Sequence, residues 1–62
     1  MIYQEIYKYG CEELASADIA EASLDARYLL EYVCKTDRNT LLVHGDREVS
    51  AQEENSYKEL SN

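Results

Sequence analysis

The stretch Leu24–Val33, LDARYLLEYV, decides the fold of this chain. Read as a helix of about 100° per residue, it carries apolar side chains on two sides. The main stripe consists of Ala22, Ala26, Leu29, Leu30 and Val33, and a second stripe consists of Leu24, Tyr28 and Tyr32. A helix on the surface of a small protein needs only one apolar face. The second stripe therefore predicts a helix that packs between others.

A first helix is predicted before this stretch, over residues 2–17. One of its faces carries Ile2, Tyr3, Ile6, Gly10, Leu14 and Ala17, with Tyr7 at the edge. Gly10 lies in the middle of that face, where glycine costs about 1 kcal/mol relative to alanine. We expect close approach of a second helix at Gly10 as the compensation. Tyr9 falls on the polar side and is predicted to be exposed.

A short third helix is predicted over residues 38–44, after the central helix of residues 22–35. Asp37 precedes it and has the side chain of an N-cap residue. This helix is expected to bury Leu41 and Leu42. Gly45 follows it, and we expect this glycine to end the helix in the left-handed conformation that glycine adopts without strain.

A fourth helix is predicted to begin at Ser50 and to run to about residue 60. Ser50 and Glu53 have the spacing of a capping box, in which each side chain accepts a hydrogen bond from the other's backbone N–H. The apolar content of this segment is thin, and it is expected to pack through Tyr57 and Leu60. It is the weakest of the four helical patterns.

These patterns predict an all-α fold, a small bundle of about four helices with the second helix central. The 62 residues include no proline and two glycines, which favours short turns between helices over strands and hairpins. The length allows one domain at most. A chain of this size buries only about 60% of the surface that its unfolded form exposes, so its stability is expected to be marginal.

The charge distribution excludes some classes of partner. The net charge is −7, which argues against direct nucleic-acid binding because that function needs a basic surface. The segment 22–38 is neutral, whereas segments 1–21 and 39–62 carry net charges of −4 and −3. No apolar run is long enough to predict a membrane span.

The two cysteines, Cys11 and Cys34, are interpreted as reduced thiols that pack like small apolar residues. No secretory segment precedes them, which predicts a cytoplasmic protein. A zinc site needs about four ligands at close spacing. One histidine and two distant cysteines do not provide such a set, so no metal-binding residue is predicted.

No catalytic or cofactor-binding residue is predicted either. His44 has no serine or cysteine nucleophile at a recognisable spacing, and its position fits the C-terminal end of a helix, where its positive form is favoured. The acidic pairs Glu12–Glu13 and Glu53–Glu54 diverge by about 100° on a helix, so they do not converge on a substrate. Cys34 has no evident cationic neighbour that would activate its thiol.

The six tyrosines divide between the predicted core and a candidate contact surface, since tyrosine is frequent in both. Tyr3, Tyr7 and Tyr28 are assigned to the core. Tyr9 and Tyr32 remain candidates for contact with a partner.

Asp25 is the one acidic residue beside the main apolar stripe. A half-buried carboxylate needs a hydrogen-bond donor, and Arg38 is the best charge partner in the sequence. An ion pair between Asp25 and Arg38 is therefore a hypothesis that the structure can test.

The order of these residues resembles a known family. The pattern Ala22-x-x-Asp25-Ala26-x-x-Leu29-Leu30-x-x-Val33 is similar to the N-terminal domain of the HemK/PrmC family, the glutamine N5-methyltransferases of peptide chain release factors. Arg38, the pair Leu41–Leu42 and the segment 46–50, DREVS, continue the family's order of an arginine, two apolar residues, an acidic turn and a helix-opening serine or threonine. The resemblance covers almost the whole chain and is strongest over residues 22–50.

The resemblance implies a function that the residues of this chain do not show by themselves. In that family a following Rossmann-like domain binds S-adenosylmethionine and carries an Asn-Pro-Pro-Tyr motif for the substrate glutamine. This chain has no proline, so residues 1–62 are expected to be the N-terminal helical domain without the catalytic domain. The implied role is to bind a release factor while the glutamine of its Gly-Gly-Gln loop is methylated. No catalytic or cofactor residue carries over.

Two alternatives remain beside this reading. One is a free-standing helical interaction protein, such as a small adaptor, and the other is a small enzyme, which is ranked last because no site is evident. The reading frame beyond Asn62 would separate the first alternative from the methyltransferase, since a continuing frame should contain a glycine-rich cofactor loop and the Asn-Pro-Pro-Tyr motif.

Overall fold

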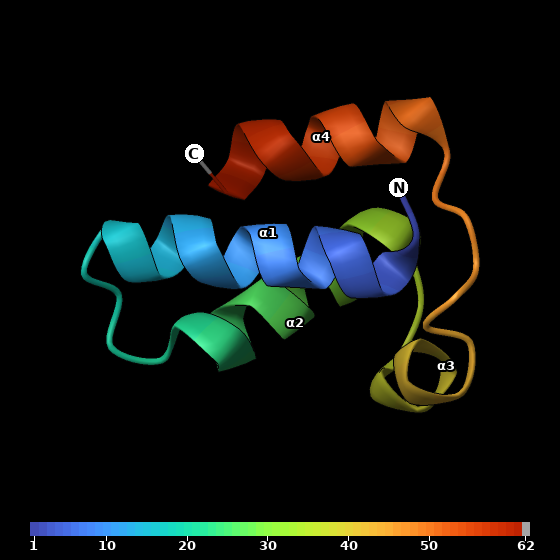
Figure 1. Cartoon of the computed structure of the whole chain (residues 1–62), viewed down its shortest axis with the longest axis horizontal. Helices are drawn as coiled ribbons and strands as arrows, with labels where there is room; N and C mark the ends of the chain where they lie inside the picture. Colours follow the sequence, from blue (N-terminus) through green and yellow to red (C-terminus); the bar gives the residue numbers. More distant parts are fainter. Residues whose placement is uncertain (62) are drawn as a thin grey trace.

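The computed structural model describes residues 1–61, and these residues form four α-helices joined by short turns (Figure 1). The helices are α1 (Tyr3–Ser16), α2 (Ala22–Cys34), α3 (Arg38–Val43) and α4 (Ala51–Ser61). The predicted all-α fold is confirmed, and the predicted helix ends lie within one or two residues of the observed ones. No helix in residues 1–61 is long and apolar enough to cross a membrane.

The core lies where α1, α2 and α4 meet. In Figure 1 α2 crosses behind α1, α4 lies along the opposite side, and α3 stands apart at one end of the bundle. Ile6 of α1, Leu30 of α2 and Tyr57 of α4 are the largest fully buried side chains. Ala26 is also fully buried, one turn before Leu30. The central position of α2 is therefore confirmed, because it packs against both neighbours.

The second stripe of α2 does not form a second packing face. Leu24 is half-buried, whereas Tyr28 is 55% exposed and Tyr32 is 76% exposed. The assignment of Tyr28 to the core is thus wrong, and Tyr32 faces solvent. The reason is geometric: α1 and α4 lie side by side over the main stripe, so one broad apolar face serves two neighbours.

The packing is very close at Gly10. A Cβ atom built on Gly10 would lie 2.7 Å from Cζ and 2.9 Å from Cε2 of Tyr57, closer than real Cβ contacts come. The hydroxyl of Tyr57 donates a hydrogen bond to the carbonyl oxygen of Ala26, at 3.0 Å. The predicted close approach at Gly10 is confirmed, and the tyrosine of α4 makes it. Tyr57 thereby connects α4 to both α1 and α2.

Local capping signals are confirmed at two helix starts. The backbone N–H of Thr40 donates to Oδ1 of Asp37 at 2.8 Å, which caps α3. The N–H of Glu53 donates to Oγ of Ser50 at 3.1 Å, and the N–H of Ser50 approaches Oε1 of Glu53 at 3.4 Å. Each of these hydrogen bonds joins residues three positions apart, so the sequence alone could predict both caps.

The predicted role of Gly45 is wrong. Its φ is not positive, and α3 ends at His44 with φ −117°. Gly45 is buried, its carbonyl oxygen accepts a hydrogen bond from the N–H of Gln4 at 3.0 Å, and a Cβ atom here would lie 2.8 Å from Cγ of Gln4. The left-handed positions are instead Asp18, with φ 65°, and Lys35, which ends α2 with φ 51°.

For three side chains the predicted burial or exposure is wrong. Leu42 is 69% exposed and Leu60 is 56% exposed, so neither is part of the core. In place of Leu60, the buried C-terminal contact of α4 is Ser61, whose hydroxyl donates to the carbonyl of Tyr57 at 2.8 Å. Tyr9, predicted to be exposed, is half-buried against the core with the ammonium of Lys58 5.3 Å from its ring centre.

Candidate binding surface

A hollow of about 310 Å³ opens between α1, α2 and α3. We call it the α3 hollow. Its lining combines aromatic, aliphatic and basic side chains: Tyr3, Gln4, Tyr7, Arg27, Leu30, Arg38, Leu41 and Leu42. Leu30 at its floor is fully buried and Leu41 is half-buried, whereas Leu42 at its edge is 69% exposed. The hollow is thus an apolar concavity with an exposed leucine at its rim.

The two charged residues of this lining are both arginines. Nε of Arg27 lies 3.3 Å from Oε2 of Glu31, one turn along α2, and its guanidinium carbon lies 5.4 Å from the ring centre of Tyr28. The contact with Glu31 lacks hydrogen-bond geometry, and Nε is buried without a hydrogen-bond partner in the described part of the chain. Arg38 is exposed and forms no side-chain ion pair within residues 1–61.

The predicted ion pair between Asp25 and Arg38 does not form. Asp25 is exposed rather than half-buried, and its carboxylate is not within ion-pair distance of Arg38. An exposed carboxylate is hydrated and needs no partner, so the argument from burial does not apply. Arg38 instead lines the hollow next to Arg27.

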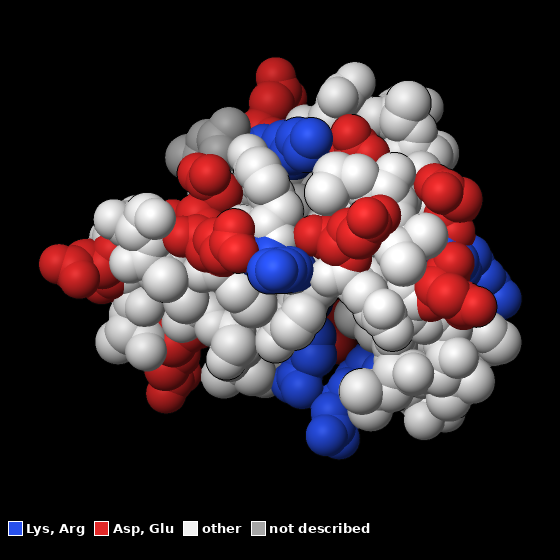
Figure 2. Space-filling model, in the orientation of Figure 1, with Lys and Arg blue, Asp and Glu red and all other residues white. Residues whose placement is uncertain are grey.

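The surroundings of the hollow differ in charge from the rest of the surface. Figure 2 shows acidic side chains spread over most of this face, with basic side chains among them at the top, centre and right, while the lower centre of the view, below α1, is mainly basic. In a chain with 13 acidic and 6 basic residues, two arginines at one concavity are a local reversal of the overall charge.

The tyrosines of the hollow are structural. Tyr3 is buried, and burial raises the pKa of its hydroxyl. The hydroxyl of Tyr7 donates to the carbonyl of Ser23 at 3.3 Å, and burial raises its pKa as well. Both phenols therefore stay protonated near neutral pH. Both offer apolar surface to the hollow, and the hydrogen bond of Tyr7 ties α1 to the start of α2. The assignment of Tyr3 to the core is confirmed, and Tyr7 is half-buried against the core.

A second, more open hollow lies between the end of α2 and α4. It is lined by Tyr32, Val33, Lys35, Gln52, Glu53, Ser56 and Leu60. Its charged side chains have opposite signs, Lys35 and Glu53, so it presents no single charge to a partner. Tyr32 and Leu60 contribute its exposed apolar surface.

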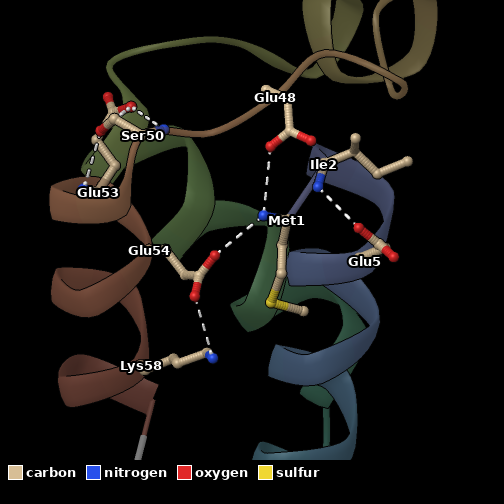
Figure 3. A network of polar contacts seen from close by, with 8 residues as sticks. All are labelled: Met1, Ile2, Glu5, Glu48, Ser50, Glu53, Glu54 and Lys58. Carbon is tan, nitrogen blue, oxygen red and sulfur yellow. Dashed lines mark hydrogen bonds and ion pairs between the residues drawn. The ribbon is translucent and has the colours of Figure 1, made fainter.

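The chain start forms a polar network with α4 and with the loop before it (Figure 3). The ammonium group of Met1 lies 3.1 Å from Oε1 of Glu54 and 3.4 Å from Oε2 of Glu48, and Glu54 also pairs with Lys58 at 3.3 Å. The hydrogen bond with Glu54 raises the pKa of the ammonium group, and the same contact lowers the pKa of Glu54.

The backbone reinforces this network. The N–H of Tyr3 donates to the carbonyl of Arg47 at 3.1 Å, and the N–H of Val49 donates to the carbonyl of Met1 at 3.0 Å. These bonds flank an isolated antiparallel bridge between Ile2 and Glu48. The first turn of α1 thus finds acceptors in the loop, which satisfies donors that a helix start otherwise leaves unpaired. We call this contact the N-terminal seam.

The residues weighed for catalysis do not come together. His44 is exposed at the end of α3, Glu53 takes part in the capping box, and Glu54 belongs to the N-terminal network. Cys11 and Cys34 are both free thiols, and burial raises the pKa of Cys34 to about 11. Within residues 1–61 no group of three or more histidine, cysteine or acidic residues is placed to hold a metal ion.

Sequence reasoning missed the α3 hollow. Part of the signal was present, since Arg27 and Leu30 are neighbours on one helical face and Arg38, Leu41 and Leu42 share the next helix. What the pattern did not contain is the angle at which α3 leaves the bundle, and that angle brings the two arginines to one site.

Comparison with known protein families gives one match. A family model described as the PrmC N-terminal domain matches residues 5–62, almost the whole chain. Searches of curated proteins and of solved structures gave no match.

Proposed function

The chain belongs to the PrmC N-terminal domain family, and from this membership we propose that it binds a peptide chain release factor and orients it for methylation. The family match over residues 5–62 is the observation that carries the proposal. The reaction is the transfer of a methyl group to N5 of the glutamine in the Gly-Gly-Gln loop. S-adenosylmethionine supplies that group in the Rossmann-like domain, which lies outside residues 1–62.

The physical role of such a module is to orient the reacting amide. Binding energy from a remote surface fixes a protein substrate in place, so that the reaction at the amide needs less loss of motional freedom. A rigid module serves this role better than a flexible one. The capped helices and the fully buried Tyr57 supply that rigidity. Exposed apolar side chains at the α3 hollow supply contact area.

The net charge of −7 would make a second, weaker contribution to binding, through the rate of association with the partner. An acidic surface attracts a basic protein over long range and raises the association rate, and salt screens this attraction. If the partner carries a basic face, the rate should fall as ionic strength rises.

The experiment is a titration of the isotope-labelled 62-residue chain with its unmethylated release factor at low salt, followed by amide resonances. We expect saturating shifts confined to a contiguous surface. An unrelated basic protein of similar size serves as the control for non-specific attraction. No shift with the release factor, or equal shifts with both proteins, would contradict the proposal and favour a free-standing adaptor with another partner.

A further inference from the structure

The α3 hollow combines apolar side chains with charged side chains of one sign only, whereas the hollow between α2 and α4 carries both signs. Leu42 exposes most of its side chain at the rim, and the half-buried Leu41 lies beside it. Arg38 carries an unpaired guanidinium, although the chain has more than two acidic residues for each basic one. The hollow thus presents apolar surface and an unpaired positive charge at one concavity, a combination that suits contact with a partner.

We propose that this hollow receives an acidic and apolar segment of the partner protein, in which a carboxylate pairs with Arg38 and an adjacent aliphatic or aromatic side chain packs against Leu41 and Leu42. This inference rests on the proposed function, because the partner is taken to be the release factor. It adds the surface and the chemistry of the segment that binds there.

Charge complementarity selects the carboxylate. Arginine presents a planar fork of donors that matches a carboxylate, and burying Arg38 beneath a neutral or basic segment would leave its charge unpaired. Arg27 adds a second positive charge to the lining, which Glu31 at 3.3 Å offsets in part. The phosphates of a nucleic acid would meet the same arginines, but the acidic side chains over α1 and α4 would repel an extended polyanion (Figure 2).

The size of the hollow selects a short segment. A volume of about 310 Å³ is at the small end of pockets that hold ligands, so it accommodates one or two side chains rather than a whole helix. Its floor is apolar through Leu30, and its aromatic wall is made by Tyr3 and Tyr7. Such a lining favours an aliphatic or aromatic side chain over a polar one.

The hollow between α2 and α4 supplies matched controls. Lys35 and Leu60 line it, and both are exposed as Arg38 and Leu42 are. Removing a positive charge or an exposed leucine there changes the composition equally but leaves the α3 hollow intact. All four positions are exposed, so the folded state should survive each substitution, and the amide spectrum of each variant verifies this.

The test measures the affinity of the 62-residue chain for the release factor in four variants. We expect Arg38→Gln and Leu42→Ser each to weaken binding at least about tenfold, since a buried charge pair and a central apolar contact both have effects of that size or larger. Lys35→Gln and Leu60→Ser should change affinity less than about threefold. A peptide pair, N-acetyl-Glu-Leu amide and N-acetyl-Gln-Leu amide, probes the chemistry separately, and the glutamate peptide should shift the resonances of α3 at lower concentration.

The outcomes separate the two proposals. If the unmodified chain does not bind the release factor, the proposed function fails. If it binds but Arg38→Gln and Leu42→Ser bind equally well, or if the control variants weaken binding more, the α3 hollow is not the site and the function stands. Equal binding of the two peptides would overturn the selection for a carboxylate.

Discussion

The ring of Tyr57 occupies the space that a side chain on Gly10 would need, and its hydroxyl is bonded to the carbonyl of Ala26. One residue of α4 thus sets the distance between α1 and α2. Tyr57 is fully buried, and burial raises the pKa of its hydroxyl, so the hydrogen bond keeps its donor across the whole neutral range.

Gly10→Ala should destabilise the fold, although alanine is the better helix former. The gain in helix propensity is about 1 kcal/mol, but a methyl group forced against a fixed ring costs up to about 3 kcal/mol, so we expect a net loss of about 1–2 kcal/mol. Urea denaturation measures this loss. Gly45→Ala is the comparison, because the clashing neighbour there is the exposed side chain of Gln4, which can move. Its cost should be smaller.

The same substitution in a Tyr57→Leu background isolates the contact. Without the ring, Gly10→Ala should lose most of its cost or become stabilising. An unchanged cost in both backgrounds would show that Tyr57 is not the reason for glycine at this position.

Ser50→Ala should weaken the start of α4. It removes the acceptor of the Glu53 N–H and the hydroxyl that bonds the Glu53 carboxylate, so we expect a loss of about 1 kcal/mol in the free energy of unfolding. Ser56→Ala makes the same chemical change at an exposed position inside the same helix and should be neutral or slightly stabilising. Equal effects of the two substitutions in urea denaturation would contradict a capping role for Ser50.

Cys34 should react slowly with thiol reagents in the folded protein. Burial raises its pKa from 9.0 to about 11, and Glu53 adds to the effect. A rise of two units lowers the thiolate fraction near neutral pH about 100-fold, and the thiolate is the reactive form. In a Cys11→Ser background, alkylation by iodoacetamide should be slow when folded and fast in concentrated urea. Similar rates in the two states would contradict the shift.

The N-terminal network should give stability an optimum between weakly acidic and weakly alkaline pH. The pKa of the Met1 ammonium is raised, so its contribution is complete below its ordinary value of 8.0 and is lost as pH rises through the folded value. The pKa of Glu54 is lowered, so its contribution is complete above its ordinary value of 4.5 and is lost as pH falls through the folded value.

Thermal melting of the chain with a free Met1 amino group, between about pH 3 and pH 9, checks this profile. In the Glu54→Gln variant the melting temperature should fall less steeply as pH rises on the alkaline side. On the acidic side the loss of melting temperature should become only partly smaller. The N-cap carboxylate of Asp37 also has a lowered pKa, so its contribution to stability is lost in acid as well. An alkaline side as steep as in the unmodified chain would show that the Met1–Glu54 contact does not contribute.

The fold could be predicted where it depends on residues close together in the sequence. The helix periodicity placed Ile6, Gly10, Ala26 and Leu30 on packed faces, and the caps at Asp37 and Ser50 follow from spacings of three residues. These features depend on the chain's own geometry and need no knowledge of the partner helix.

The errors concern which side of a helix meets another. Tyr28, Leu42 and Leu60 carry apolar side chains but lie outward, because α1 and α4 share one face of α2 and α3 stands apart. The contact of Gly45 with Gln4 likewise joins distant parts of the chain. The meeting of Arg27 and Arg38 depends on the same helix placement, and no helical pattern encodes it.

The N-terminal seam has a consequence for the order of folding and for local opening of the folded protein. It joins Met1 to Glu48, 47 positions away, whereas α1 and α2 meet across a short turn. Contacts close in sequence form first, so the seam should close late and reopen early. The amide protons of Tyr3 and Val49 should therefore exchange with solvent sooner than that of Leu30. Because α3 is joined along the chain to α2 on one side and to the loop of the seam on the other, each such opening would loosen one of the two attachments of the helix that borders the α3 hollow.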